Sequence, residues 1–548
     1  MILINGVLKE VRRFFHKTIV FSILLFSAFL IQANEAASTN VMAPLVVSDW
    51  VTFDQQLVTA KAMGVDAVSV DVWWGKVERA GDEVFDWSYY DTLVQHIENA
   101  ELNWVPIMSF HQCGGNVGDD CNIPIPSWIW SHYNGTSADD MKYLSEQNNT
   151  SIETVSLWKD TLVVSQYTEF MNAFENHFAN KAFMTDEINI SMGPAGELRY
   201  PSYNSHDTGS GYPTRGAFQS YSTPAKADFR LWTSAKYGSI GAINSAWGTA
   251  LPNTAAINPP SNADFFISNG DQYNSQYGRD FIRWYHESLK SHGIRMMDAA
   301  MVAFNDAFAS KELGYKIPGV HWQMGTPSNY SRSAEMAAGL IPSDIDLNSD
   351  NTAHGYSNII NVAANYQNSS HKVVLHFTAL EMNNENFSPQ YSKAKDLVFW
   401  VANGAAAQGV TIKGENALSG GVSSNVGWDN IENSFSFASY SGLTVLRVGD
   451  VTNGTGKSRY SSFIKDFHSQ WYFSGTPNSW GTWNMVNVGG SLWEMTQWFR
   501  ADGAFRIRHS DVNWDEAYPS VNWDIWQGAG NYTITFDASD HTIVVLKL

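Results

Sequence analysis

Short β-rich runs, each ending in polar or glycine-containing sequence, recur along most of the chain. We expect strands at residues 44–50, 67–75, 104–111, 188–197, 316–323, 372–382, 409–418 and 442–450. Amphipathic stretches typical of helices follow several of them, one opening at residues 86–93 and a long one lying within 278–308. Strands that alternate with helices predict parallel pairing with right-handed crossovers. The pattern therefore predicts an α/β fold, a (β/α)8 TIM barrel with long βα loops over residues 38–468, although a doubly wound sheet would show the same alternation.

The composition changes near residue 470, because residues 471–548 hold eight of the 22 tryptophans. Segments 532–536 and 542–546 predict two antiparallel strands. We therefore expect a small all-β sandwich over residues 469–548. Exposed indole faces suit the flat, apolar faces of sugar rings, which favours a carbohydrate-binding module. The alternative is that all of these tryptophans lie in the core of the module.

The first residues have the order of a secretory signal peptide. Four basic residues between Lys9 and Lys17 precede an apolar run over residues 18–31, and small residues follow. The run is short for a membrane span, although an uncleaved anchor is the alternative. We predict a signal peptide over residues 1–37 and a secreted protein, extracellular or, in a host with an outer membrane, periplasmic. No membrane association is expected after cleavage.

Cys113 and Cys121 are the two cysteines of the chain. In an exported protein, a pair this close in sequence can oxidise to close a small loop. The prediction is a disulfide, and two free thiols are the alternative.

Net charge and missing motifs exclude several function classes. The formal charge is −20, and an acidic surface repels phosphate backbones, so nucleic acid is not an expected partner. The negative charge of the surface would not repel a neutral polymer. The chain shows no HExxH, no P-loop, no GxGxxG opening a helix and no GxSxG. Zinc-protease, nucleotide-hydrolase, dinucleotide and serine-hydrolase interpretations therefore lack their required residues.

Polar side chains stand at the predicted strand ends, where a barrel collects its catalytic groups. Glu197 lies in the segment GPAGELRYPSY, whose glycines and prolines break a helix, and Glu415 follows Gly414 at the end of a later strand. Two carboxylates flanking a glycosidic bond, one protonated and one ionised, are the minimum apparatus for glycoside hydrolysis. The sequence does not give their separation, so retaining and inverting outcomes both stay open. The alternative for Glu197 is a surface turn residue.

Six motifs occur in the order found in one family. They are Asp71-Val72-Trp73-Trp74-Gly75, residues 111–120, residues 193–203, His321-Trp322-Gln323, residues 377–382 and residues 414–418. Together they resemble β-amylase, glycoside hydrolase family 14, over roughly residues 40–465, and the bacterial branch more than the plant branch. The resemblance implies a (β/α)8 barrel that releases β-maltose, with inversion, from non-reducing ends of α-1,4-glucans such as starch, amylose and glycogen. It implies no cofactor for catalysis, and we expect a monomer.

The resemblance also assigns roles to individual residues. Glu197 would be the general acid and Glu415 the general base. Sugar contacts would come from Asp71, His111, Asp119, Lys316, His321, Thr378, Asn416, Ala417 and Arg447. Of these, Thr378 would lie on an inner loop that stabilises the deprotonated base. A lid that closes over substrate would contain Gly114, Gly115, Asn116, Val117 and Gly118, with a Cys113–Cys121 bridge tethering both ends.

Two further assignments concern a metal and the C-terminal module. Bacterial members bind a structural calcium near the second strand, which implies oxygen ligands here at Glu78, Asp82, Glu83 and Glu169. A solvated acidic surface is the alternative. Residues 474–480 resemble modules attached to other amylolytic enzymes, so starch binding is expected there by analogy, with Trp480, Trp483 and Trp526 as the stacking residues. Ser419 departs from the family, which usually has proline at that position.

The main rival interpretation is a non-catalytic α-glucan-binding relative used for capture or sensing. Such a protein needs neither a proton donor nor a base. The presence of Glu197, Glu415 and Thr378 together with the lid segment favours the enzyme.

Overall fold

The computed structural model describes residues 37–115, 119–326 and 329–548, which divide between two compact units, Ala37–Ser469 and Gln470–Leu548. The signal peptide expected over residues 1–37 lies, apart from Ala37, outside the described residues. Among the residues that are described, no helix is both long enough and apolar enough to cross a membrane.

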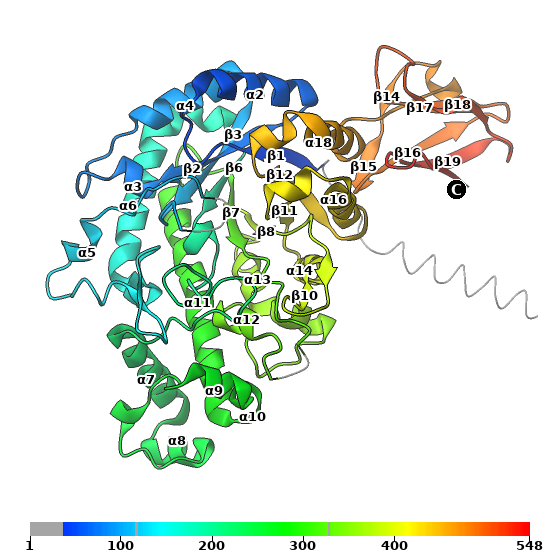
Figure 1. The fold of residues 1–548 in the computed structure, drawn as a ribbon. Helices are drawn as coiled ribbons and strands as arrows, with labels where there is room; N and C mark the ends of the chain where they lie inside the picture. The colour runs from blue at the N-terminus through cyan, green and yellow to red at the C-terminus, as the bar shows by residue number, and fades with distance from the viewer. Residues whose placement is uncertain (1–36, 116–118, 327–328) are drawn as a thin grey trace, which may run out of the picture. The chain divides into compact units, whose positions relative to one another are not determined.

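The first unit is built on a closed barrel of eight parallel strands (Figure 1). Their order around the barrel is β1-β12-β11-β8-β7-β6-β3-β2, and every neighbouring pair is parallel. The barrel strands are β1 (Ser38–Met42), β2 (Ala67–Trp73), β3 (Asn103–Ser109), β6 (Glu187–Ile190), β7 (Glu312–Ile317), β8 (Val373–Phe377), β11 (Ile412–Glu415) and β12 (Tyr440–Val445). The (β/α)8 barrel predicted from the alternation of strands and helices is confirmed.

A major helix follows each barrel strand along the chain, as a parallel barrel requires for its crossovers. These helices are α2 (Trp50–Met63), α4 (Ser88–Asn99), α6 (Asp160–Phe178), α11 (Gln276–Ala303), α13 (Ser357–Ala364), α14 (Ala394–Ala407), α16 (Asn425–Phe437) and α18 (Gly454–Phe467). The connection from β6 to β7 is the most elaborate and also holds α7 (Thr223–Tyr237), α8 (Ile240–Trp247), α9 (Ala263–Ser268) and α10 (Asp271–Asn274). Figure 1 shows these four helices gathered around one end of the long α11.

The first strand is not where the hydrophobic pattern predicted it. The expected segment 44–50 is a loop, and the strand is β1, whose Thr39 and Asn40 are both buried. Buried polar residues conceal a strand from a rule based on apolar runs. The helix that follows begins at Trp50, because the Asp49 side chain accepts a hydrogen bond from the Thr52 backbone N–H and caps its first turn.

The fourth strand is shorter than predicted. The expected strand 188–197 leaves the sheet after Ile190, and a 3-10 turn at Pro194–Gly196 follows. Ala195 in that turn has φ 55°, a conformation that a strand cannot include. Glu197 therefore lies on a short irregular loop beyond the strand end.

The second unit consists of two four-stranded sheets, which is the all-β architecture expected for this region. One has the order β14-β13-β17-β18 and the other β15-β16-β19-β20. Their strands are β13 (Tyr472–Gly475), β14 (Trp483–Asn484), β15 (Val486–Gly489), β16 (Leu492–Phe499), β17 (Ala504–Arg508), β18 (Ala517–Asp524), β19 (Gly530–Asp537) and β20 (Ile543–Lys547). Phe499 packs against Phe473 and Phe505 of the other sheet with ring centroids 5.9 Å apart in each pair, so both sheets share one core. β19 and β20 pair antiparallel, as predicted.

Candidate active site

Glu197 lies on the loop beyond the C-terminal end of β6 and is linked to the neighbouring strand β7. Its backbone pairs with that of Lys316 in β7, and the Leu198 N–H donates to the Lys316 carbonyl oxygen at 2.7 Å. Gly196, directly before it, has φ +79° and lies against the imidazole of His111. The backbone around Glu197 is thus fixed by a neighbouring strand on one side and by the ring of a predicted sugar-binding residue on the other.

The Glu197 carboxylate contacts two side chains of its own segment. Arg199 Nε donates to Glu197 Oε2 at 2.8 Å, and the Tyr203 hydroxyl donates to the same oxygen at 3.3 Å. The Arg199 guanidinium lies 4.0 Å from the centre of the Tyr203 ring. Since Arg199 is buried, with an exposed fraction of 2%, these contacts hold the carboxylate in one orientation.

Glu415 is the last residue of β11, and its side chain is buried between two cationic groups. Lys316 Nζ lies 2.5 Å from Glu415 Oε2, and His376 Nδ1 of β8 lies 3.6 Å from Glu415 Oε1. Burial alone would raise the pKa of Glu415, but the charges of Lys316 and His376 outweigh it and lower the pKa below its usual value. The carboxylate is therefore ionised at neutral pH.

Lys316 connects the two glutamates. Its backbone pairs with Glu197, and its ammonium group contacts Glu415. Burial would lower the pKa of Lys316, but the charges of Glu415, Glu197 and Asp71 raise it. Three of the predicted catalytic and sugar-binding carboxylates therefore lie around one lysine at one end of the barrel.

Asp71 and His111, predicted to bind the terminal glucose, both lie close enough to Lys316 for its charge to act on them. Asp71 Oδ1 accepts a hydrogen bond from Ser109 at 2.8 Å, and burial raises the pKa of Asp71 although Arg447 and Lys316 oppose the shift. Burial lowers the pKa of His111 to about 3. His111 is therefore neutral at ordinary pH and offers hydrogen bonds rather than charge.

His321 lies in the loop after β7, and Thr378 directly follows β8. His321 is buried, its Nδ1 lies 2.7 Å from Ser392 Oγ, and burial lowers its pKa to about 4. The Thr378 hydroxyl accepts a hydrogen bond from the Gly319 N–H at 2.9 Å. Thr378 was expected on a loop that stabilises the deprotonated base, and in this structure its hydroxyl contacts the β7 loop.

The residues after Glu415 are held by the Asn416 side chain and by the backbone N–H groups of Ala417 and Leu418. Asn416 bonds to the Leu446 carbonyl and N–H groups at 3.0 and 2.8 Å. The Ala417 and Leu418 N–H groups donate to the Glu381 carboxylate at 2.8–3.0 Å. Arg447 Nη1 donates to the Ala43 carbonyl at 3.2 Å, and its charge acts on Asp71.

The segment predicted as a lid is described at both of its ends. Cys113 and Cys121 form a disulfide, with their Cα atoms 5.7 Å apart. Gly114 and Gly115 have φ +117° and +99°, values that favour glycine, and the Gly114 N–H donates to Asp119 Oδ2 at 2.9 Å. Asn116, Val117 and Gly118 lie outside the described residues.

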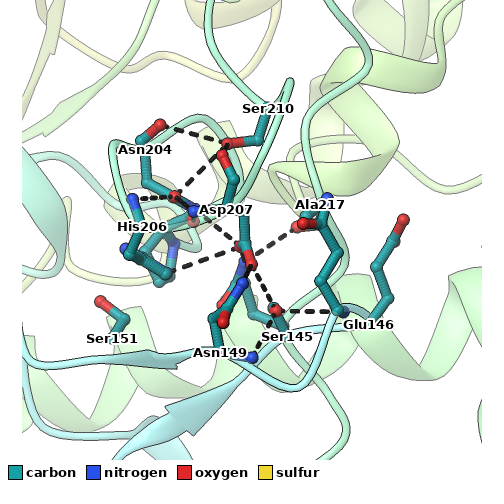
Figure 2. A network of polar contacts seen from close by, with 12 residues as sticks. Ser145, Glu146, Asn149, Ser151, Asn204, His206, Asp207, Ser210 and Ala217 are labelled. Carbon is teal, nitrogen blue, oxygen red and sulfur yellow. Dashed lines mark hydrogen bonds and ion pairs between the residues drawn. The ribbon is translucent and has the colours of Figure 1, made fainter.

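A polar network that no sequence motif marks ties two loops together (Figure 2). The buried Asp207 carboxylate accepts hydrogen bonds from Ser145, Asn149, Asn204 and Gln219 at 2.6–3.1 Å. His206 lies 3.7 Å from Glu153 and 3.6 Å from Asp207. The network anchors the chain that runs on from Tyr203, which contacts Glu197. Its members are ordinary polar residues far apart in sequence, so no local signal marks them.

Three of the four predicted calcium ligands lie close together. Carboxylate oxygens of Glu78, Asp82 and Glu169 lie within 4.8 Å of one another. Burial raises the pKa of Glu78 and of Glu169 to about 7, and neighbouring carboxylates add to both shifts. The exposed Glu83 lies outside this group, although its charge also raises the pKa of Glu169.

The tryptophans of the C-terminal unit fall into two sets. Trp471 and Trp493 are core residues, whereas Trp526 and Trp483 are 78% and 40% exposed. The alternative that all of them are core residues is therefore wrong. Trp480 is half-buried beside Trp514, with ring centroids 6.1 Å apart.

Comparison with known proteins places this site in a class. A match to the family described as Glycosyl hydrolase family 14 covers residues 40–471. A "Beta-amylase" of Niallia circulans is 42% identical, covering 77% of this chain and 69% of the relative, and one of Cytobacillus firmus is 40% identical, covering 85% and 95%. The solved catalytic domain of β-amylase from Paenibacillus polymyxa superposes with a TM-score of 0.70 at 39% identity, covering 79% of this chain and 98% of that one. A barrel with these relatives is a glycoside hydrolase, and the chain belongs to glycosyl hydrolase family 14.

Proposed function

We propose that this chain is an exo-acting, inverting hydrolase that releases β-maltose from the non-reducing ends of α-1,4-glucans. Glu197 is the general acid and Glu415 the general base. The observation that carries the proposal is the buried, ionised Glu415 beside Lys316, linked through the Lys316 backbone to Glu197. The family relationship and β-amylase relatives support the choice of substrate.

In the reaction, the oxygen of a water molecule attacks the anomeric carbon while Glu415 takes one of its protons. The bond between that carbon and the glycosidic oxygen breaks, and Glu197 gives its proton to the leaving oxygen. Lys316 and His376 keep Glu415 ionised before the step, as a base requires. Arg199 and Tyr203 orient Glu197 toward one oxygen, since errors of about 1 Å in position can cost on the order of 10²-fold in rate.

Asp71 and His111 bind the terminal glucose, and Lys316 and His321 contact the following sugars. Asp119, Thr378, Asn416, Ala417 and Arg447 complete the sugar sites.

The test is proton NMR of the anomeric signals during the first minutes of soluble-starch hydrolysis. β-Maltose that appears first and mutarotates later supports the inverting mechanism, and α-maltose appearing first contradicts it. Binding of amylose with no release of sugar would instead identify a glucan-binding relative without chemistry.

A structural calcium fits the group of Glu78, Asp82 and Glu169. Hard carboxylate oxygens are the ligands calcium prefers, and Glu169 Oε1 is buried without a hydrogen-bond partner. Without a metal, the raised pKa values of Glu78 and Glu169 mean that ionisation above about pH 4.5 costs stability, increasingly up to about pH 7. We expect millimolar Ca²⁺, but not Mg²⁺, to raise the unfolding temperature most at pH 7 and above. An equal response in the variant Glu169→Gln would exclude this site.

The C-terminal unit binds starch by stacking sugar rings on its indoles. The exposure of Trp526 and Trp483 supports these two as stacking residues. Trp480 is included because it lies beside Trp514. Trp526→Ala is expected to weaken adsorption to starch granules without changing the rate on maltotetraose. Trp471 is a buried core residue and is therefore unsuitable as a control. Tyr472→Ala, which removes a half-buried aromatic residue of β13, serves as the control instead. Unchanged adsorption in Trp526→Ala would remove that residue from the site.

The protein is exported with residues 1–37 as the signal peptide and acts as a monomer outside the membrane. The basic and apolar order of residues 9–31 and the Cys113–Cys121 disulfide support export. The mass of the mature N-terminus and light scattering after size exclusion test the two statements.

A further inference from the structure

The interior of the barrel carries a layer of charged side chains where packed apolar residues are usual. TIM barrels typically fill these positions with branched apolar residues. Here four neighbouring strands, β6, β7, β8 and β11, supply ionisable residues instead. The layer consists of Glu187, Lys316, His376, Lys413 and Glu415.

The strand register explains how these groups meet. His376 pairs with Lys316 on one side and with Lys413 on the other. Gly314 of β7 leaves space for the layer, because a side chain at that position would collide with Glu187 and Asn189. All five side chains are buried or nearly so, and buried charges persist only when they are paired.

The pairs form a continuous path that ends at the general base. His376 Nδ1 is 3.6 Å from Glu415 Oε1, beyond hydrogen-bond range but within that of an ion pair. On its other side, His376 Nε2 lies 2.5 Å from Glu187 Oε1. Glu187 in turn lies 2.6 Å from Lys413 Nζ. The imidazole is thus held between a catalytic carboxylate and one that the mechanism does not use.

We infer that His376, held by Glu187, is a positioning residue that keeps the general base Glu415 ionised and oriented. The inference rests on the proposed role of Glu415. Glu187 fixes the ring by accepting from Nε2, which leaves Nδ1 directed at Glu415. A doubly protonated imidazole in this place adds a second positive charge beside the base, in addition to Lys316.

The direction of the charge effects agrees with this arrangement. Burial would lower the pKa of His376, but Glu187 and then Glu415 raise it above its usual value. Burial would raise the pKa of Glu187, but Lys413 and His376 lower it to about 2. The His376–Glu187 ion pair is therefore complete from about pH 2 up to the raised pKa of His376. The other charged groups that face this layer are Glu312 and Asp186 at Lys413, Glu197 at Lys316, and Asp71 at Glu415 and Lys316.

The test is the pH profile of kcat/KM for maltotetraose in His376→Asn. Loss of the cation should raise the pKa of Glu415 and move the acidic limb upward by about one pH unit, a tenfold loss at low pH. Glu187→Gln should move the limb in the same direction, because His376 loses the charge that keeps it protonated. The double variant should shift no further than His376→Asn alone.

His371→Asn is the matched control. His371 precedes the same strand, is equally buried, and places its ring nitrogens on the Lys311 and Phe304 carbonyl oxygens rather than on carboxylates. We expect it to lower thermal stability and leave the acidic limb unchanged. This comparison separates an effect on Glu415 from a general loss of packing.

An acidic limb that stays in place in both His376→Asn and Glu187→Gln, while the variants still release β-maltose, overturns the inference but not the proposed function. Additive shifts in the double variant would also overturn it, since the two residues would then act separately. If His376→Asn does not fold, Glu187→Gln and His376→Gln give the same decision. Undiminished activity in Glu415→Gln would instead overturn the proposed function itself.

Discussion

The two proposed catalytic glutamates are held by different parts of the fold. Glu415 ends a barrel strand, is buried, and contacts charged side chains from two other strands of the same barrel. Glu197 lies on an irregular loop after a short strand and takes its partners, Arg199 and Tyr203, from its own segment. The base is held by the regular part of the fold and the acid by a local loop.

The difference corresponds to what each group must do. A base that must stay ionised benefits from a fixed set of cations, which rigid strands can supply. An acid has to deliver a proton to a single oxygen of a bound chain, so its position matters more than the surrounding charge. Substitutions around Glu415 and around Glu197 can distinguish the two roles, and the largest effect is expected at the glutamates themselves.

Glu197→Gln and Glu415→Gln should each lower kcat on starch by about 10²–10⁴-fold. On α-maltosyl fluoride, whose fluoride leaves without a proton, Glu197→Gln should regain most of its activity and Glu415→Gln none. Stopped assays of fluoride release measure both. If the fluoride fails to rescue Glu197→Gln, Glu197 is not the acid.

Arg199→Gln should lower kcat on starch by up to about 10²-fold, because Glu197 loses the contact that orients it. Lys316→Gln should cause a loss of similar size by removing the cation at Glu415. Only the first variant should be rescued by α-maltosyl fluoride. Equal rescue of both variants would show that Arg199 and Lys316 do not act separately on the acid and on the base.

Glu381→Gln should lower kcat about tenfold and destabilise the protein by about 1–3 kcal/mol. Its carboxylate is the acceptor for the Ala417 and Leu418 N–H groups, and a neutral amide cannot accept from both equally well. Urea unfolding followed by fluorescence gives the stability change. An unchanged unfolding midpoint would show that the loop after Glu415 is held by other contacts.

Tyr203→Phe should have the smallest effect, a loss in kcat of less than about tenfold. The hydroxyl lies 3.3 Å from Glu197 Oε2, and a single hydrogen bond contributes about 0.5–1.5 kcal/mol. The ring that packs on Arg199 remains in this variant. A larger loss would indicate that the hydroxyl itself contacts the substrate.

The alternation of strands and helices was enough to predict the barrel, and several strand ends were close to the observed ones. β2 begins at Ala67 as expected, but β1 was misplaced because its buried polar residues do not look like a core strand. β7 begins at Glu312, four residues before the expected start, since polar and glycine residues inside the barrel again conceal the strand.

The site was predictable where it depends on strand ends and less so where it depends on long-range packing. Glu197 and Glu415 were identified from motifs at strand ends and Lys316 from the family resemblance, and the structure brings all three together. His376 was missed, although it lies in β8 two residues before Thr378, and period-two alternation could have found it. The Asp207 network joins loops about sixty residues apart, and no local pattern contains that information.

The charged layer also limits which substitutions the barrel can accept during evolution. Because each ion is neutralised by a residue on another strand of the barrel, replacing one alone leaves an uncompensated charge in the interior, which typically costs several kcal/mol. Substitutions at Glu187, His376 and Lys413 should therefore be accepted only as matched sets. In an alignment of relatives, these three positions should vary together, whereas the surface helices beside them should drift independently.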